Sequence, residues 1–139
     1  MSRFITAASL LALVLSAAAG CGDDNTPTTP TEPTPPRVTE TFGGTVNRNG
    51  AVTHNFTVSR SGLLTATLTT LAPDSALVIG VSLGTWNGTT CQIVLANDRA
   101  TQGSVVTGNG GSAGNFCVRV YDVGNIGGAV EYTVTVVHF

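Results

Sequence analysis

Lysine is absent from the sequence, and only 10% of its 139 residues carry a charge. The cationic side chains belong to six scattered arginines: Arg3, Arg37, Arg48, Arg60, Arg99 and Arg119. Because nucleic-acid binding uses basic residues clustered on one surface, this scatter argues against a nucleic-acid partner. The formal net charge of −2 likewise predicts no partner recruited mainly by electrostatic attraction.

Segments with helical periodicity are also missing from the part of the chain that can form a domain. The 17 glycines, together with abundant threonine, valine and asparagine, favour strands and turns over helices. A chain of this length has room for one ordinary domain. The composition therefore predicts a single all-β domain.

The N-terminus has the pattern of an export signal. Arg3 supplies a positive charge, residues 4–19 are uncharged and mostly apolar, and small residues follow. This order predicts a secretory signal peptide over residues 1–20. A membrane-spanning helix is the alternative, but the apolar run is shorter than the ~20 residues that cross a bilayer.

The end of this signal carries a second pattern. Ala18, Ala19, Gly20 and Cys21 resemble the lipobox of bacterial lipoproteins, in which a small residue precedes a lipid-modified cysteine. The resemblance implies cleavage before Cys21, a lipid thioether on its sulfur and an acylated amino group, which together anchor the protein stably to a membrane. The alternative is ordinary cleavage, which leaves Cys21 as a free thiol. In Gram-negative lipoproteins an Asp after the cysteine favours retention in the inner membrane. Gly22 at this position favours the outer membrane, with the inner membrane as the alternative because Asp23 follows.

The next segment, residues 21–37, holds five of the six prolines and no large apolar residue. Such a segment cannot bury enough apolar surface to offset the entropy of ordering it. It is therefore predicted to be a disordered, semi-rigid linker rich in proline and threonine.

Residues 38–139 contain short apolar runs of period two, separated by Gly, Asn and Asp turns. The expected strands are 41–46, 51–59, 64–69, 76–83, 91–96, 104–107, 115–122 and 130–138. The run 76–83 is almost wholly apolar, which predicts a central strand buried on both faces. Trp86, the segment 96–103 and the glycine-rich run 108–114 are expected in loops. The pattern predicts one antiparallel β-sandwich, jelly-roll-like, of about eight strands.

Two of the three cysteines, Cys91 and Cys117, lie near the starts of expected strands. An exported chain meets an oxidising compartment, where cysteines pair. We therefore expect a disulfide between them, with two buried free thiols as the alternative. Cys21 then needs no partner.

Two Gly-x-Ser-x-Gly matches, at 80–84 and 110–114, are a weak sign of a serine hydrolase. That motif works at a strained turn between a strand and a helix, and no helix is expected after Ser82 or Ser112. The two histidines continue apolar strand faces instead of lying beside either serine. No catalytic residue is predicted.

Metal and ligand sites have little support in the sequence. Zinc needs clustered Cys and His ligands, which are missing, and the loop Asp and Asn residues lack calcium spacing and are better used to cap turns. No metal or cofactor is predicted. Trp86, Arg119 and Tyr121 form a candidate platform for a sugar or a peptide, with partial burial of a single tryptophan as the alternative.

The strands also carry a family resemblance, in "HNFTVSRSGLLTATL", "GNFCVRVYDVGN" and "EYTVTVVHF". They are similar to bacterial pre-peptidase C-terminal domains. The matching positions are Phe56, Gly62, Gly114, Asn115, Phe116, Val118, Val120, Tyr132, Val134 and Val136. The resemblance implies a compact β-sandwich, usually appended to secreted peptidases and not itself catalytic. The acidic cluster with which some relatives bind calcium is missing, so calcium and collagen binding are not carried over.

These observations predict a non-catalytic protein of the bacterial cell envelope with an accessory, adhesion or structural role. Its partners would be the membrane, through the lipid on Cys21, and an envelope polysaccharide or protein. The domain would lie in the periplasm or at the cell surface. A carbohydrate- or peptide-binding module is the alternative, and a small hydrolase is a second one.

Overall fold

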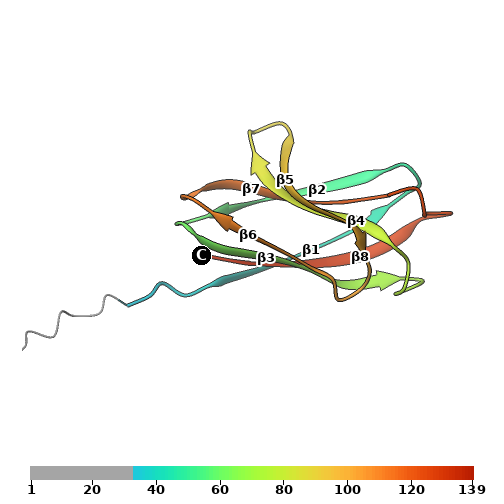
Figure 1. Cartoon of the computed structure of the whole chain (residues 1–139), viewed down its shortest axis with the longest axis horizontal. Helices are drawn as coiled ribbons and strands as arrows, with labels where there is room; N and C mark the ends of the chain where they lie inside the picture. Colours follow the sequence, from blue (N-terminus) through green and yellow to red (C-terminus); the bar gives the residue numbers. More distant parts are fainter. Residues whose placement is uncertain (1–32) are drawn as a thin grey trace, which may run out of the picture. The chain divides into compact units, whose positions relative to one another are not determined.

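Eight antiparallel strands form two four-stranded sheets that pack face to face (Figure 1). The structure is a computed structural model that describes residues 33–139. The predicted signal peptide, Cys21 and most of the predicted linker lie outside the described residues. The strands are β1 (Val38–Val46), β2 (Ala51–Val58), β3 (Gly62–Ala72), β4 (Ile79–Trp86), β5 (Cys91–Ala100), β6 (Val105–Gly110), β7 (Gly114–Tyr121) and β8 (Val130–His138).

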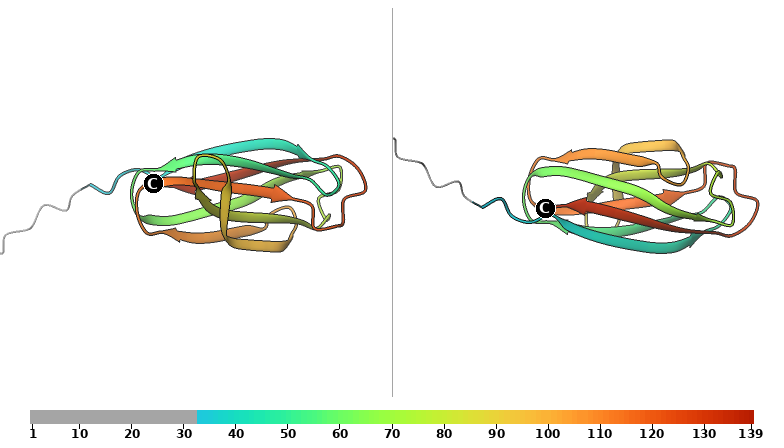
Figure 2. Two further views of the ribbon diagram at one scale, coloured as in Figure 1. Left: turned by 90° about the horizontal axis from the view of Figure 1, so that it is seen from above. Right: turned by 90° about the horizontal axis from the view of Figure 1, so that it is seen from below.

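The strand order is β1-β8-β3-β6 in one sheet and β2-β7-β4-β5 in the other. Consecutive strands therefore lie mostly in different sheets, and the chain crosses the sandwich at several of its connections (Figure 2). This order is that of a jelly roll, in which two sheets of four strands enclose one core. The predicted all-β sandwich is confirmed.

The core lies between the two sheets and follows the period of two along each strand. In β8, Tyr132, Val134 and Val136 are buried while the residues between them are partly exposed. In β3 the same alternation buries Leu64, Ala66 and Leu68. The other buried apolar side chains that pack with them are Val46, Phe56, Val58, Leu71, Ile79, Val81, Leu83, Ala100, Val106, Val118, Val120, Ile126 and Val130.

Strand β4 is central in its sheet, between β7 and β5, and its residues 79–84 are all buried. The prediction of a strand covered on both faces is therefore confirmed. The inner face is covered by the opposite sheet. The outer face is covered by the ring of Tyr121 at Gly80 and by the backbone of β5 at Gly84.

The two histidines face the interior. The Nε2 atom of His54 lies 2.8 Å from the hydroxyl of Tyr132, and the imidazole stacks on the ring of Phe42 at 5.0 Å between centroids. Burial lowers the pKa of His54 and raises the pKa of Tyr132 to about 12. His138 is fully buried, and its Nε2 lies 2.8 Å from a carboxylate oxygen of Glu40.

Several expected boundaries were wrong. Strand β5 continues through Asn97 to Ala100, β6 reaches Gly110, and Trp86 ends β4 instead of lying in a loop. Polar and glycine residues stay in these strands because their backbone pairs with a neighbour, as Asn97 does with Val81 and Gly110 with Gly62.

Two strands also begin at residues other than those expected. Strand β1 begins three residues before the expected position, at Val38, which pairs with His138. Strand β4 begins later than expected, at Ile79, because Asp74 turns the preceding segment: its side chain accepts a hydrogen bond from the amide of Ala76 and its carbonyl one from Leu77.

Candidate functional site

The disulfide predicted between Cys91 and Cys117 is present, and it joins two strands that are not neighbours. Strand β4 lies between β5 and β7 in the sheet, yet the two Cα atoms are only 5.8 Å apart. The start of β5 must therefore bend over the outer side of β4. Viewed from above, the loop joining β4 and β5 crosses β7 (Figure 2, left).

Gly84 makes this crossing possible. It is the residue of β4 that pairs with Cys117, and a Cβ atom on it would collide with the backbone carbonyl of Gln92. Any side chain at this position would therefore meet the backbone of β5. The hydrogen atom of glycine lets β5 pass directly over β4.

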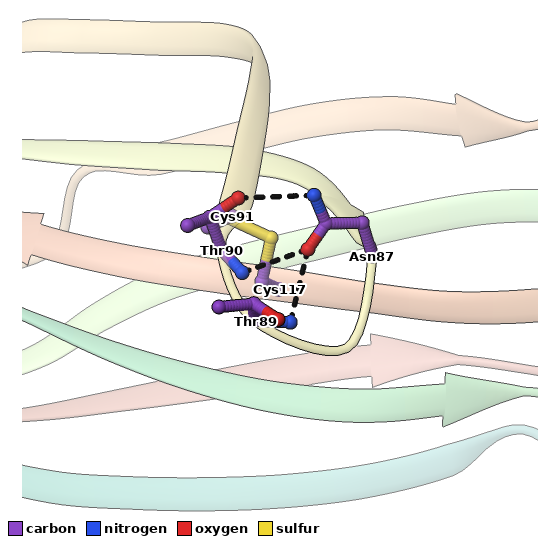
Figure 3. The surroundings of a disulfide bond; sticks show 5 residues. All are labelled: Asn87, Thr89, Thr90, Cys91 and Cys117. Carbon is purple, nitrogen blue, oxygen red and sulfur yellow. Dashed lines mark hydrogen bonds between the residues drawn. A yellow bond between two sulfur atoms is a disulfide. The ribbon is translucent and has the colours of Figure 1, made fainter.

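The loop that ends at the disulfide is held by its own hydrogen bonds (Figure 3). The side-chain oxygen of Asn87 accepts hydrogen bonds from the amides of Thr89 and Thr90, at 2.9 and 2.8 Å. Its side-chain nitrogen donates to the hydroxyl of Thr90 at 3.1 Å. The loop is thus ordered at one end by Asn87 and at the other by the disulfide.

Between this loop and the sheet lies a hollow of about 340 Å³. The half-buried ring of Trp86 and the guanidinium-bearing Arg119 contribute to it. The remaining lining residues are Ala51, Thr53, Thr89, Thr90 and Cys91. The hollow therefore combines an aromatic surface, three hydroxyl groups and one positive charge. Two of the three residues predicted as a platform meet here.

Arg119 occupies the middle of this face. On β7 it pairs with Thr53 of β2 on one side and with Ser82 of β4 on the other. Its guanidinium carbon lies 5.6 Å from the centre of the Tyr121 ring, two residues further along the same side of β7. Within residues 33–139 the one salt bridge joins His138 to Glu40, so Arg119 has no carboxylate partner there.

Tyr121 belongs to a second hollow. Its ring lies across Gly80, where a Cβ atom would collide with it, and its hydroxyl donates a hydrogen bond to Asp98. Burial, and then the carboxylate of Asp98, raise the pKa of Tyr121 to about 12. This hollow of about 640 Å³ is lined by Val78, Asp98, Arg99, Tyr121, Val123 and Asn125.

The Gly-x-Ser-x-Gly match at 80–84 is explained by packing. Its three small residues face outward from β4, where the ring of Tyr121 covers Gly80 and the backbone of β5 covers Gly84. Ser82 between them is fully buried, and its hydroxyl has no hydrogen-bond partner. No histidine among residues 33–139 is hydrogen-bonded to it, and a strand without a following helix provides no nucleophile elbow.

The second match spans the turn from the end of β6 at Gly110 to the start of β7 at Gly114, and Ser112 between them is exposed. It too has no histidine partner in the described part of the chain, since the imidazoles of His54 and His138 bond to Tyr132 and Glu40. Neither serine is therefore arranged for attack on a substrate.

Three of the Asp and Asn side chains that were expected in loops, those of Asp74, Asn97 and Asp122, accept hydrogen bonds from backbone amides. Asp122 is the clearest case: its carboxylate accepts hydrogen bonds from the amides of Asn49, Gly124, Asn125 and Ile126 at 2.8–3.1 Å. These bonds lower the pKa of Asp122. Over residues 33–139, no group of three or more His, Cys, Asp or Glu side chains is arranged to hold a metal ion.

A separate groove of about 310 Å³ lies at the edge of the sandwich beside β5 and β6. Leu64, Leu83 and Phe116 contribute its apolar floor, and Val94 and Leu95 of β5 border it. Ile93, Val94 and Leu95 are consecutive aliphatic side chains that are 45, 69 and 38% exposed. Sequence reasoning assigned these residues to an ordinary strand, because alternation alone does not reveal that a strand lies at an edge.

Sequence reasoning also missed the three threonines of the Trp86 hollow. Thr89 and Thr90 reach it only because the loop folds back over the sheet. The pair Asn87-Gly88 indicates a tight turn, but it does not indicate that the loop folds back over the sheet.

In comparisons with known proteins, no family model and no curated protein matches the chain. Among the residues that the structure describes, no helix is long and apolar enough to span a membrane.

Proposed function

We propose that this chain is a non-catalytic, lipid-anchored protein of the bacterial cell envelope that binds polysaccharide on the outer face of the sheet β2-β7-β4-β5. The observation that carries the binding role is the hollow that Trp86, Arg119 and three threonines line together. Its volume of about 340 Å³ lies within the range of small-molecule sites, and an aromatic wall with a few polar groups is their usual lining.

The chemistry of the hollow suits a sugar ring. A pyranose presents an apolar face of C–H groups, which packs on an aromatic ring, and a rim of hydroxyls, which need donors and acceptors. The indole of Trp86 provides the flat apolar surface and one N–H donor. The hydroxyls of Thr53, Thr89 and Thr90 both donate and accept, and the guanidinium of Arg119 only donates.

The hollow is also preformed. The disulfide from Cys91 to Cys117 and the bonds of Asn87 fix the loop that forms one wall, while β2 and β7 form the other. A wall that is ordered before binding lowers the entropy lost when a ligand binds. This supports recognition of a ligand rather than a purely structural role.

The remainder of the proposal concerns where the domain is held. The lipobox-like end of the N-terminal segment would place a lipid on Cys21, and residues 22–36 would serve as a spacer of up to ~45 Å at ~3 Å per residue. The resemblance to pre-peptidase C-terminal domains and the burial of Ser82 both favour a role without catalysis.

The binding role is tested with the full chain, purified in detergent, in affinity electrophoresis through gels containing envelope polysaccharides. We expect retardation of the native protein and its loss in Trp86→Ala. The control is Ile93→Ala, which removes an exposed apolar side chain outside the hollow and should leave retardation unchanged. A folded Trp86→Ala variant with undiminished retardation would contradict the proposal.

The anchoring role is tested separately by mass spectrometry of the native N-terminus combined with membrane fractionation. The expected result is a diacylglyceryl-modified and acylated Cys21 in the membrane fraction. Cys21→Ser should move the protein out of that fraction. An unmodified Cys21 in a soluble fraction would contradict the proposed lipid anchor and would leave the proposed binding role unaffected.

A further inference from the structure

The charge in the Trp86 hollow is unbalanced. Of the residues that line it, Arg119 alone is charged, and neither an Asp nor a Glu is among them. In the neighbouring hollow, the carboxylate of Asp98 accepts the hydrogen bond of the Tyr121 hydroxyl. Arg119 therefore lines the Trp86 hollow, and no carboxylate of residues 33–139 forms a salt bridge with its guanidinium.

The surroundings of Arg119 hold this charge in place. The ring of Tyr121 lies beside the guanidinium carbon at 5.6 Å, a cation–π contact that stabilises a positive charge without neutralising it. On its other side Arg119 pairs with Ser82, whose buried hydroxyl has no hydrogen-bond partner. The three residues paired across β2, β7 and β4 are Thr53, Arg119 and Ser82, and none of them is an anion.

We propose that the sugar bound in this hollow is acidic, and that its carboxylate pairs with the guanidinium of Arg119. This inference rests on the proposed function and adds the chemical class of the ligand. A guanidinium offers parallel N–H groups that match the two oxygens of a carboxylate, and such charge-assisted pairs are about twice as strong as neutral hydrogen bonds. The sugar ring then lies against Trp86, with its hydroxyls near Thr53, Thr89 and Thr90.

The test compares an acidic ligand with its uncharged methyl ester. A short oligogalacturonate and its methyl ester are titrated into the full chain in detergent by calorimetry, with a neutral glucan oligosaccharide of equal length as a third ligand. Loss of one charge-assisted pair corresponds to a ~10- to 100-fold change in affinity. We expect the acid to bind that much more tightly than the ester.

Two variants locate the preference. Arg119→Gln should bind acid and ester equally, whereas Arg48→Gln, which removes an exposed arginine from the β1–β2 turn, should keep the native preference. The comparison of acid with ester on the native protein tests the preference even if Arg119→Gln fails to fold. Raising the salt concentration from about 50 to about 500 mM should weaken binding of the acid and leave binding of the ester nearly unchanged, because salt screens only the charged contact.

The outcomes separate this inference from the proposed function. Equal affinity for acid, ester and glucan, lost in Trp86→Ala, would uphold sugar binding and overturn the preference for an acidic sugar. A preference for the acid that survives in Arg119→Gln would also overturn it. Binding of none of the three ligands would count against the sugar-binding role as well.

Discussion

Removal of the disulfide should destabilise the sandwich by an amount set by the loop that it closes. Cys91 and Cys117 are 26 positions apart, and closing a loop of that length lowers the entropy of the unfolded chain. On the chain-entropy model the contribution is ~3.5 kcal/mol at 25 °C. The double variant Cys91→Ala with Cys117→Ala should therefore unfold with a free energy lower than that of the native protein by this amount.

The assay is urea unfolding of the full chain, followed by the fluorescence of its single tryptophan, Trp86. A loss of this size lowers the urea midpoint by roughly 1 to 3 M for a domain of this length. Cys21→Ala is the control: it removes the third cysteine, which takes no part in the disulfide and precedes the sandwich in sequence, so its midpoint should equal that of the native protein even though the proposed lipid is lost. If the double variant unfolded within ~0.5 kcal/mol of the native protein, the loop-closure reasoning would be refuted.

Two further predictions concern packing and protonation. Gly84→Ala should lower the free energy of unfolding by ~1–3 kcal/mol in the same urea assay, because its Cβ would press on the backbone of Gln92. Gly111→Ala is the control and should change this free energy by less than ~0.5 kcal/mol, because no atom lies within 4 Å of the position of its Cβ. Burial lowers the pKa of His54 in the folded state, so the unfolded chain binds more protons as the pH falls. The stability contributed by neutral His54 is fully present above the unfolded pKa of 6.5 and is lost as the pH falls through the folded pKa. The free energy of unfolding should therefore fall less steeply below pH 6.5 in His54→Gln, and equal slopes in the two proteins would contradict the burial argument.

Much of the fold is encoded locally, in the alternation of side chains. The strands around Phe56, Leu64 and Val134 were predictable because one face of each must be buried, and a period of two identifies that face. The almost wholly apolar run that contains most of β4 was equally informative, since a strand covered on both faces has no polar side.

The strand ends were not encoded in the same way. Asn97 and Gly110 have the character of loop residues, yet both belong to strands because their backbone groups pair with Val81 and Gly62. Pairing of this kind depends on which strands become neighbours, and strand order is a property of the whole fold. Local patterns therefore placed the elements correctly and their boundaries poorly.

The candidate site was predictable in part. Arg119 and Tyr121 face the same side because they are two residues apart on one strand. Trp86 and Arg119 line one hollow because β4 and β7 are neighbours in the sheet, and the wall opposite follows from the crossing of β5 over Gly84, which no local pattern reports. The same crossing brings Thr89 and Thr90 to the hollow, which is why sequence reasoning did not identify them.

The most direct test of the central claim is an NMR titration of the isotope-labelled full chain in detergent with the oligosaccharide that it binds. Binding in the hollow predicts shifts of the Trp86 indole N–H and of the amides of Thr53, Thr89 and Thr90, with little change along β6 and the outer edge of β5. Shifts confined to the apolar groove beside Val94 and Leu95, or no shifts at saturating ligand, would contradict the claim that the outer face of this sheet binds polysaccharide.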